Sequence, residues 1–241
     1  MLKVSYLSHR NILHAEMCLA SDERGALILW TGEALRQTIL FPALRLVAPL
    51  RVEGLEHLCG DGPFLFAANH SSHLDAPLVL ASLPGRLRLR LRVAAAADYF
   101  FNTRCKGALV RLTLNAFAFE RKGPGREASL EYAQHLLAGG QSVLIFPEGT
   151  RSQDGHMQPF KRGVGTLALA GSVPVIPIQI EGAHVAWPKG VRWPRRRRVQ
   201  VVVRFGAPLT FACPDDPLRV AALVEQAVRE LANAPTCIAG F

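Results

Sequence analysis

A short apolar run that stops at a polar turn, in residues 64–75, constrains the fold more than any other stretch of the chain. Phe64–Ala68 is continuously apolar behind Gly62-Pro63, which predicts a strand buried on both faces. A polar turn follows at residues 69–72, and then apolar side chains recur with helical spacing at Leu74, Pro77, Leu78, Leu80 and Ala81. Ser72, with Asp75 three residues later, has the capping-box pattern that opens a helix. We therefore predict a strand, a turn and a helix, with a polar cluster at the turn.

The turn contains a histidine and a carboxylate five residues apart, His70 and Asp75. On one continuous helix these side chains would differ by roughly 140° and face apart. We therefore expect His70 to precede the helix and to fold back onto Asp75. The carboxylate would then fix the imidazole tautomer through one ring nitrogen and leave the other nitrogen to accept a proton. Such a pair is a general base with its orienting group, without a nucleophile of its own.

Three other interpretations of this turn are open at this point. Asp75 can be no more than the capping carboxylate of its helix. His70 and His73 can be a metal pair, which is disfavoured because no third ligand stands nearby at a useful spacing. Ser71 or Ser72 can be a hydrolase nucleophile, which is disfavoured because neither lies in a Gly-x-Ser-x-Gly elbow. A second motif is needed to decide among them.

The alternation of strands and helices continues along the chain. Strands are expected within residues 46–53, 86–93, 114–120, 142–146, 173–180 and 199–205, and helices after residue 74, over 128–137, over 164–170 and from Pro217 onward. This order predicts an α/β fold with a mixed, mostly parallel sheet flanked by helices. In such sheets the ligand crevice lies at the carboxyl ends of the strands, which is where the turn at His70 falls.

Residues 86–93 alternate strictly between arginine and an apolar residue. This pattern is typical of a strand with one buried face, and it would place four arginines on the other face. The favoured interpretation is a solvated sheet edge that resists aggregation. The functional alternative is a positive wall that faces phosphates or anionic lipid.

At 241 residues the chain is long enough for one substantial domain, which we place at residues 51–241 behind an N-terminal helical segment, residues 1–50. Residues 26–50 are apolar enough to suggest a membrane span. Glu33, Arg36 and Arg45 would each cost about 2.5–3.5 kcal/mol near a bilayer centre, whereas each Leu, Ile, Phe or Val returns only about 0.3–0.6 kcal/mol. Pro42 and Pro49 are also expected to break the helix. We expect a helix in the membrane interface or, as the alternative, a helical hairpin packed on the domain.

Cysteine usage and the start of the chain indicate a cytoplasmic protein. The five cysteines are scattered and form no C-x-x-C pair, so neither a disulfide framework nor a metal site is expected. The first 24 residues mix apolar with charged side chains, unlike a secretory signal.

The net charge of +9 predicts attraction to polyanions. Residues 187–198 contain two tryptophans and six basic residues, which is typical of a loop that binds an anionic membrane surface reversibly. We therefore expect a peripheral protein on the inner face of a membrane. Nucleic acid is disfavoured as a partner, because aromatic content is only 7% and the arginine-rich stretch has no aromatic side chain to stack on bases.

The second motif is Phe-Pro-Glu-Gly-Thr-Arg-Ser at residues 146–152, again directly after an expected strand. Combined with Asn-His-Ser-Ser-His-Leu-Asp at residues 69–75, it resembles the glycerolipid acyltransferase family of the 1-acylglycerol-3-phosphate (lysophosphatidic acid) acyltransferase type. Residues 116–121 and 173–178 resemble two weaker blocks of that family, and the resemblance covers about residues 50–210. The second block of the family usually opens with Gly where this chain has Ala116, which leaves the details of acceptor binding open.

The resemblance implies a glycerol-3-phosphate acyltransferase-like fold and an acyltransferase domain at residues 51–241. It also implies acyl transfer from acyl-CoA or acyl carrier protein, as co-substrate and without a cofactor, to the free hydroxyl of a lysophospholipid acceptor. His70 would be the base and Asp75 its orienting group. The implied substrate-binding residues lie mostly in the second motif: Arg121, Glu148, Gly149, Thr150, Arg151 and Lys161.

Within that set, Arg151 and Arg121 are the first choices for the acceptor phosphate and Lys161 is a weaker third, because a guanidinium fork matches phosphate oxygens. As the plainer alternative, any one of these cations can be a surface ion-pair partner. Glu148 would hydrogen-bond acceptor or catalytic groups, and Gly149 would let the backbone approach the ligand. The alternative activities are glycerol 3-phosphate or other lysolipid acylation, thioester or lipid hydrolysis, and non-catalytic binding to a membrane surface.

Overall fold

The computed structural model describes residues 23–171, 173–195, 199–212 and 215–233. The first 22 residues of the expected N-terminal segment lie outside this part of the chain. So do Arg196–Arg198 of the basic loop and three of the five cysteines, Cys18, Cys213 and Cys237.

Seven strands form one mixed sheet in the order β1-β7-β6-β2-β5-β3-β4. Every neighbouring pair is parallel except β6 with β7, which confirms the predicted mostly parallel sheet. The strands are β1 (Leu50–Glu53), β2 (Leu65–Ala68), β3 (Leu91–Ala96), β4 (Ala116–Phe119), β5 (Ser142–Ile145), β6 (Val175–Glu181) and β7 (Val201–Phe205).

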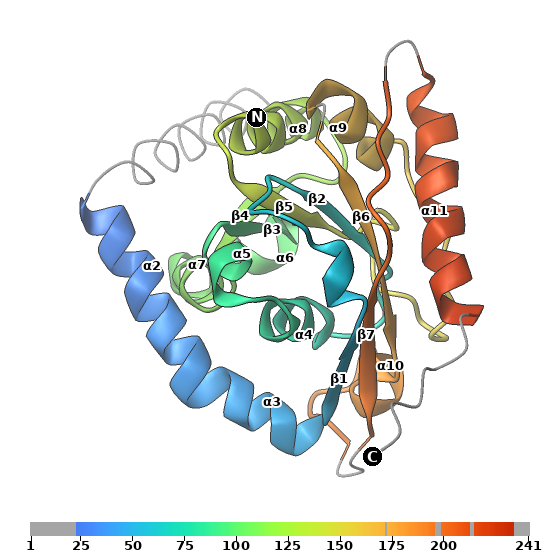
Figure 1. Cartoon of the computed structure of the whole chain (residues 1–241). Helices are drawn as coiled ribbons and strands as arrows, with labels where there is room; N and C mark the ends of the chain where they lie inside the picture. The colour runs from blue at the N-terminus through green and yellow to red at the C-terminus, as the bar shows by residue number, and fades with distance from the viewer. Residues whose placement is uncertain (1–22, 172, 196–198, 213–214, 234–241) are drawn as a thin grey trace.

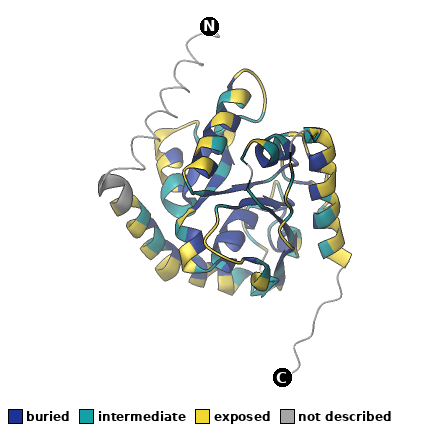
Figure 2. Ribbon diagram, turned by 45° about the horizontal axis from the view of Figure 1, so that its top comes forward, coloured by how far each residue is buried: buried dark blue, intermediate teal, exposed yellow. Residues whose placement is uncertain are grey.

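Helices cover both faces of the sheet, as Figure 1 shows. One face carries α4 (Asp75–Ser82), α5 (Gly85–Leu89), α7 (Arg104–Leu114) and the short α10 (Ala183–Ala186). The other face carries α8 (Gly125–Ala138), α9 (Gly163–Gly171) and α11 (Pro217–Asn233). The short α6 (Ala97–Phe100) follows β3, and a 3-10 turn, η2 (Leu55–His57), follows β1. The helices turn buried stripes toward the sheet and exposed stripes toward solvent (Figure 2).

The central strand β2 is buried on both faces, as its apolar run predicts. Phe66 and Ala68 pack into the core on the α4 side, whereas Leu65 and Ala67 pack into the core under α8, α9 and α11. All four residues are fully buried. The turn that follows β2 is therefore attached to a fully buried strand in the middle of the sheet.

Residues 23–47 form one helical arm along the outside of α7 and α4 (Figure 1). The arm consists of α2 (Glu23–Leu35), a π-turn η1 (Arg36–Leu40) and α3 (Phe41–Val47). Pro42 does not break it, contrary to the sequence prediction. This proline lies in the first turn of α3, where a backbone N–H has no helical partner to lose, and the wide π-turn precedes it.

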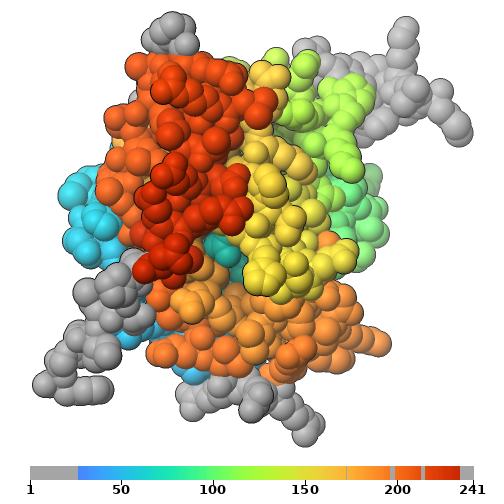
Figure 3. Space-filling view, turned by 90° about the vertical axis from the view of Figure 1, so that its right-hand side faces the viewer, coloured from blue at the N-terminus to red at the C-terminus, as the bar shows by residue number. Residues whose placement is uncertain are grey.

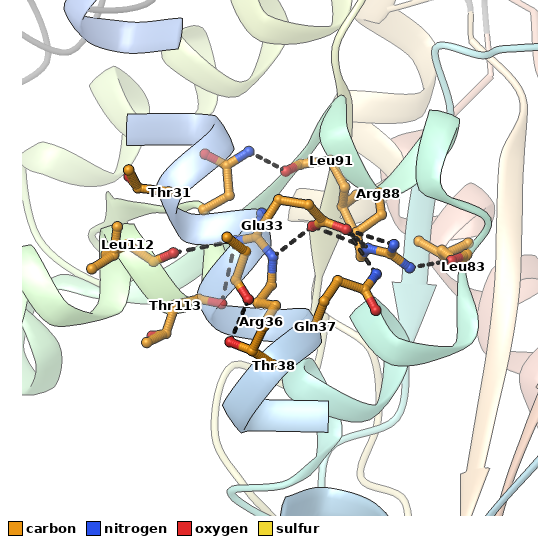
Figure 4. Close-up of polar contacts among 12 residues, drawn as sticks. Thr31, Glu33, Arg36, Gln37, Thr38, Leu83, Arg88, Leu91, Leu112 and Thr113 are labelled. Atoms are coloured by element: carbon orange, nitrogen blue, oxygen red, sulfur yellow. Dashed lines mark hydrogen bonds and ion pairs between the residues drawn. The ribbon is translucent and has the colours of Figure 1, made fainter. Parts of the chain in front are cut away.

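Buried charges fasten this arm to the domain (Figure 4). Arg36 is 1% exposed, donates to the carbonyl oxygens of Leu112 and Thr113, and pairs with Glu33. Arg88 donates to both carboxylate oxygens of Glu33 at 2.6–3.2 Å. Burial alone would raise the pKa of Glu33, but hydrogen bonds from Arg88, Gln37 and Arg36 outweigh it and lower the pKa to about 2.

The arm thus packs on the domain, which was the alternative to an interfacial helix, although it is a single rod over residues 23–47 and not a hairpin. Within the part of the chain that the structure describes, no helix has the length and apolarity needed to cross a bilayer. The outer face of the helical arm exposes large apolar side chains, among them Leu27, Trp30 and Leu46.

The prediction of a single strand over residues 86–93 is wrong. Residues 85–89 form helix α5, and β3 begins at Leu91 between β5 and β4, so it is not a sheet edge. Pro84 precedes α5, and the alternation is too short to separate a period of 2 from a helical turn. The arginines do not share a face: Arg88 turns inward to Glu33, whereas Arg86 is exposed and pairs with Asp61.

Candidate active site

A cavity of about 690 Å³ opens at the carboxyl ends of the parallel strands β2, β3, β4 and β5. The residues that line it include residues shortly after the strand ends: His70 after β2, Asp98 after β3 and Phe146 after β5. The lining is predominantly apolar, with several cations. This position agrees with the crevice predicted from the strand order.

His70 and Asp75 meet as the sequence predicts. His70 lies before α4, and its Nδ1 is 2.7 Å from Oδ2 of Asp75. Asp75 is fully buried, while the His70 side chain is 21% exposed and stacks on the Phe146 ring with centroids 4.1 Å apart. With Nδ1–H donating to the carboxylate, Nε2 is the nitrogen that can take a proton.

Asp75 also binds the backbone of the turn, which agrees with the plainer interpretation of this residue as a capping carboxylate. The same Oδ2 accepts the backbone N–H of Ser71 at 2.7 Å and of Ser72 at 2.8 Å. The Ser72 hydroxyl donates to the Trp187 carbonyl oxygen at 2.7 Å and accepts from the Leu74 N–H, which leaves it an unsuitable nucleophile. Among the described residues, no group of three or more His, Cys, Asp or Glu is arranged to hold a metal.

The second motif holds the His70 loop from both sides. Glu148 accepts the His70 N–H at 2.6 Å through one oxygen and the Gln158 N–H at 3.0 Å through the other. Ser152 donates its N–H to the His70 carbonyl oxygen at 2.8 Å. Glu148 is 3% exposed and does not line the cavity, so of its two expected partners, acceptor or catalytic groups, it contacts the loop of His70. Asn69 fixes the loop further through two hydrogen bonds to Ile180 in β6.

Burial raises the pKa of Glu148 to about 7, more than its two backbone hydrogen bonds lower it. The folded protein therefore holds a proton here that the unfolded chain, with a value of 4.5, releases at lower pH. The contribution of Glu148 to the free energy of unfolding is greatest below pH 4.5 and falls as pH rises to about 7, by on the order of 3 kcal/mol.

We expect Glu148→Gln to remove that pH dependence, because glutamine does not titrate. Urea unfolding of both proteins from pH 5 to pH 8 measures it: the difference in unfolding free energy, wild type minus variant, should decrease with pH by on the order of 3 kcal/mol. A difference that stays constant across this range would show that Glu148 ionises normally.

Gly149, Thr150 and Arg151 line the cavity. Gly149 has φ of +74°, and a Cβ at this position would lie 2.5 Å from Lys161 Nζ, so the turn requires glycine and brings Lys161 close to the backbone. Arg121 donates to the Gly149 carbonyl oxygen at 2.8 Å and to both oxygens of Asp98. Arg121 is thus an ion-pair partner in the cavity wall, which was the plainer alternative for this residue.

Arg151 and Lys161 have more capacity for a ligand. Nη1 of Arg151 is buried without a hydrogen-bond partner, and the guanidinium lies 5.8 Å from the centroid of the Tyr99 ring. Burial lowers the pKa of Lys161, and the nearby Lys122, Arg121 and Arg126 lower it further. This end of the cavity therefore has a positive potential that favours an anion.

Two residues of the cavity carry no signal in the sequence. Tyr99 and Lys189 come from segments outside both motifs, and only the folded chain brings them to Arg151. His73, in contrast, is in the first motif but is not a second base. Burial, followed by the charge of Arg151, lowers its pKa to about 4, so it is neutral and weakly basic near pH 7.

Comparison with solved structures supports the fold. A crystal structure of the 1-acyl-sn-glycerophosphate acyltransferase PlsC from Thermotoga maritima matches with a TM-score of 0.63, covering 98% of this chain and 100% of that chain at 24% identity. This likeness confirms the predicted acyltransferase-like α/β architecture.

Curated sequences are also similar to this chain. A 1-acyl-sn-glycerol-3-phosphate acyltransferase of Limnanthes douglasii is 30% identical over 163 residues, and an alpha form from Bos taurus is 34% identical over 169 residues. These alignments cover 67% and 69% of this chain, but the chain spans only 54% and 57% of the length of the two relatives.

One family model matches the part of the chain that contains both motifs. It is described as Acyltransferase and aligns with residues 49–181, from the start of β1 to the end of β6. The chain therefore belongs to the acyltransferase family.

Proposed function

We propose that this chain transfers a fatty acyl group from acyl-CoA or acyl carrier protein to the free hydroxyl of 1-acylglycerol 3-phosphate, which forms phosphatidic acid. The observation that carries the proposal is the 2.7 Å contact between His70 Nδ1 and the buried Asp75 at an apolar cavity that also holds the unpartnered Arg151 nitrogen. The names of the relatives favour the same reaction.

In the proposed mechanism, Nε2 of His70 removes the proton from the acceptor hydroxyl as its oxygen attacks the thioester carbonyl. Asp75 holds the ring and stabilises the imidazolium that forms. The tetrahedral intermediate collapses with cleavage of the carbon–sulfur bond, and the imidazolium returns the proton to the departing thiolate. No acyl-enzyme is needed, so positioning of two substrates supplies much of the rate.

The cavity suits these substrates. Arg151 is the first choice for the acceptor phosphate and Lys161 the second, because Arg121 is already engaged by Asp98. The acyl chains have an apolar lining that both layers of helices contribute, including Phe100, Leu130, Phe160, Val164 and Leu167.

The direct test is thiol release from a long-chain acyl-CoA and from an acyl carrier protein, with and without lysophosphatidic acid, combined with detection of phosphatidic acid. Acceptor-dependent release with product formation is expected. Release that ignores the acceptor would indicate a thioesterase, and no release from either donor would indicate a binding module. Glycerol 3-phosphate and other lysophospholipids, tested in parallel, define the acceptor.

We also propose that the protein works on an anionic membrane surface, on the inner face where these donors occur. The support is exposed apolar and basic side chains on two segments. Leu27 and Trp30 on α2 are 65% and 64% exposed, and Trp193 is 70% exposed with Arg192 against its ring. Such side chains insert at a headgroup boundary, and each basic residue there contributes about 1 kcal/mol.

We expect Trp193→Ser to weaken binding to vesicles that contain anionic phospholipid by about tenfold, because a buried tryptophan contributes on the order of 1.5 kcal/mol or more. Co-sedimentation measures the bound fraction. Leu223→Ser, on the exposed face of α11, is the matched control and should bind as wild type does. Equal binding of the wild type and Trp193→Ser would exclude this loop from the membrane contact.

A further inference from the structure

Lys189 lies beside the second motif although it comes from the loop after α10. Its Nζ donates to the Arg151 carbonyl oxygen at 2.9 Å and to the Thr150 hydroxyl at 3.3 Å. It lines the cavity together with His70 and Arg151. In Figure 3 the orange segment that contains this loop lies directly against the yellow segment around residue 150.

The loop that carries Lys189 is fixed to the catalytic turn. Trp187 accepts a hydrogen bond from the Ser72 hydroxyl, and Pro188 forms a β-bridge with the same serine. The Trp187 ring N–H donates to the Val191 carbonyl oxygen at 2.8 Å and closes the loop around Lys189. Because the Ser72 N–H is itself bound by Asp75, Lys189 and His70 are held by one hydrogen-bonded unit.

The charges at this position are unbalanced. In the described part of the chain, neither Lys189 nor Arg151 forms an ion pair with a carboxylate. An ammonium has three donors, of which Lys189 uses two, and Arg151 has its buried Nη1 without a partner. Two cations that line one cavity and have free donors favour a multiply charged anion such as a phosphate monoester.

The position also fits the geometry of the reaction. Ser152, the residue after Arg151, contacts the His70 backbone, and His70, Arg151 and Lys189 line the same cavity. In a 1-acylglycerol 3-phosphate, the reacting hydroxyl and the phosphate are on adjacent carbons, so they must bind close together. We infer that Lys189 binds the acceptor phosphate together with Arg151, an inference that rests on the proposed function.

The test compares Lys189→Met, Lys189→Arg and the matched control Lys106→Met, at an exposed position on α7 outside the cavity lining. Water-soluble acceptors are used so that membrane binding does not contribute: 1-hexanoylglycerol 3-phosphate, and 1-hexanoylglycerol, which lacks the phosphate. We expect Lys189→Met to raise KM for the phosphate acceptor by about 10- to 100-fold and to leave KM for the neutral acceptor within about threefold. Lys189→Arg should recover most of the loss, and Lys106→Met should match wild type.

Lys189 could instead only hold the second motif in place, without contact to the phosphate. Lys189→Met would then lower kcat with both acceptors alike, and that result overturns the inference. Calorimetric binding of 1-hexanoylglycerol 3-phosphate, without donor, tests the site independently of turnover. Binding at least about tenfold weaker in Lys189→Met supports it, and equal binding or none in the wild type overturns it. Binding of this acceptor by a wild type that transfers no acyl group would keep the phosphate site and remove the proposed reaction.

Discussion

Replacement of His70 by alanine should lower kcat for acyl transfer by about 10²- to 10⁴-fold, the usual contribution of a positioned general base. The loss is expected in chemistry and not in folding. His70 is partly exposed, and Asp75 keeps its two backbone donors, Ser71 and Ser72, when the ring is removed. Thiol release with lysophosphatidic acid, together with the unfolding midpoint in urea, measures both quantities.

The matched control is His135→Ala, at an exposed position on α8 outside the cavity lining. It should retain wild-type activity. A His70→Ala protein that keeps more than about a tenth of the wild-type rate would contradict the assignment of this residue as the base.

The contact between His70 and Asp75 was predictable because the residues that determine it are close together in the sequence. The apolar run of β2, the turn and the start of α4 fall within residues 64–82. Helical geometry requires His70 to lie before the helix begins if its side chain is to meet Asp75. The position at the strand ends followed from the alternation of elements, since parallel strands place their carboxyl ends at one edge. Both conclusions follow from patterns that are local in the sequence.

The remainder depends on distant contacts, which a single sequence does not reveal. Residues 86–93 alternate like a strand, but Arg88 is in helix α5 and binds Glu33, which is 55 residues away in the sequence. Glu148 was expected to bind acceptor or catalytic groups, and the sequence does not tell that its oxygens accept from the backbone of His70 and Gln158. Lys189 was read as part of a membrane loop, because nothing in its own segment indicates Arg151 as its partner.

Three loops thus position one imidazole. The β2–α4 turn supplies the ring and its carboxylate, the second motif holds the backbone of His70 at its N–H and its carbonyl oxygen, and the loop after α10 binds Ser72. The other hydrogen bonds of His70 involve its backbone. Among the described residues, the imidazole ring itself has one polar contact, with Asp75. The charge of that carboxylate therefore acts on the imidazole through a direct hydrogen bond.

Asp75→Asn should separate this charge from the capping role, and we expect it to reduce kcat by about 10²-fold or more. All three hydrogen bonds to Asp75 converge on Oδ2, whereas Oδ1 is buried without a partner. An asparagine whose amide oxygen replaces Oδ2 keeps these contacts, since the reverse orientation would set its NH₂ group against the same donors. The imidazole keeps its tautomer but loses the charge that stabilises the imidazolium.

Asp75→Ala is the matched comparison, because it removes the acceptor as well as the charge. It leaves the buried N–H groups of Ser71 and Ser72 without a partner, at about 1–3 kcal/mol each, so its unfolding free energy should fall well below that of Asp75→Asn. Activity assays and urea unfolding of both variants separate the two roles. Near wild-type activity in a stable Asp75→Asn protein would mean that Asp75 only caps α4, and His70 would then act without a charged partner.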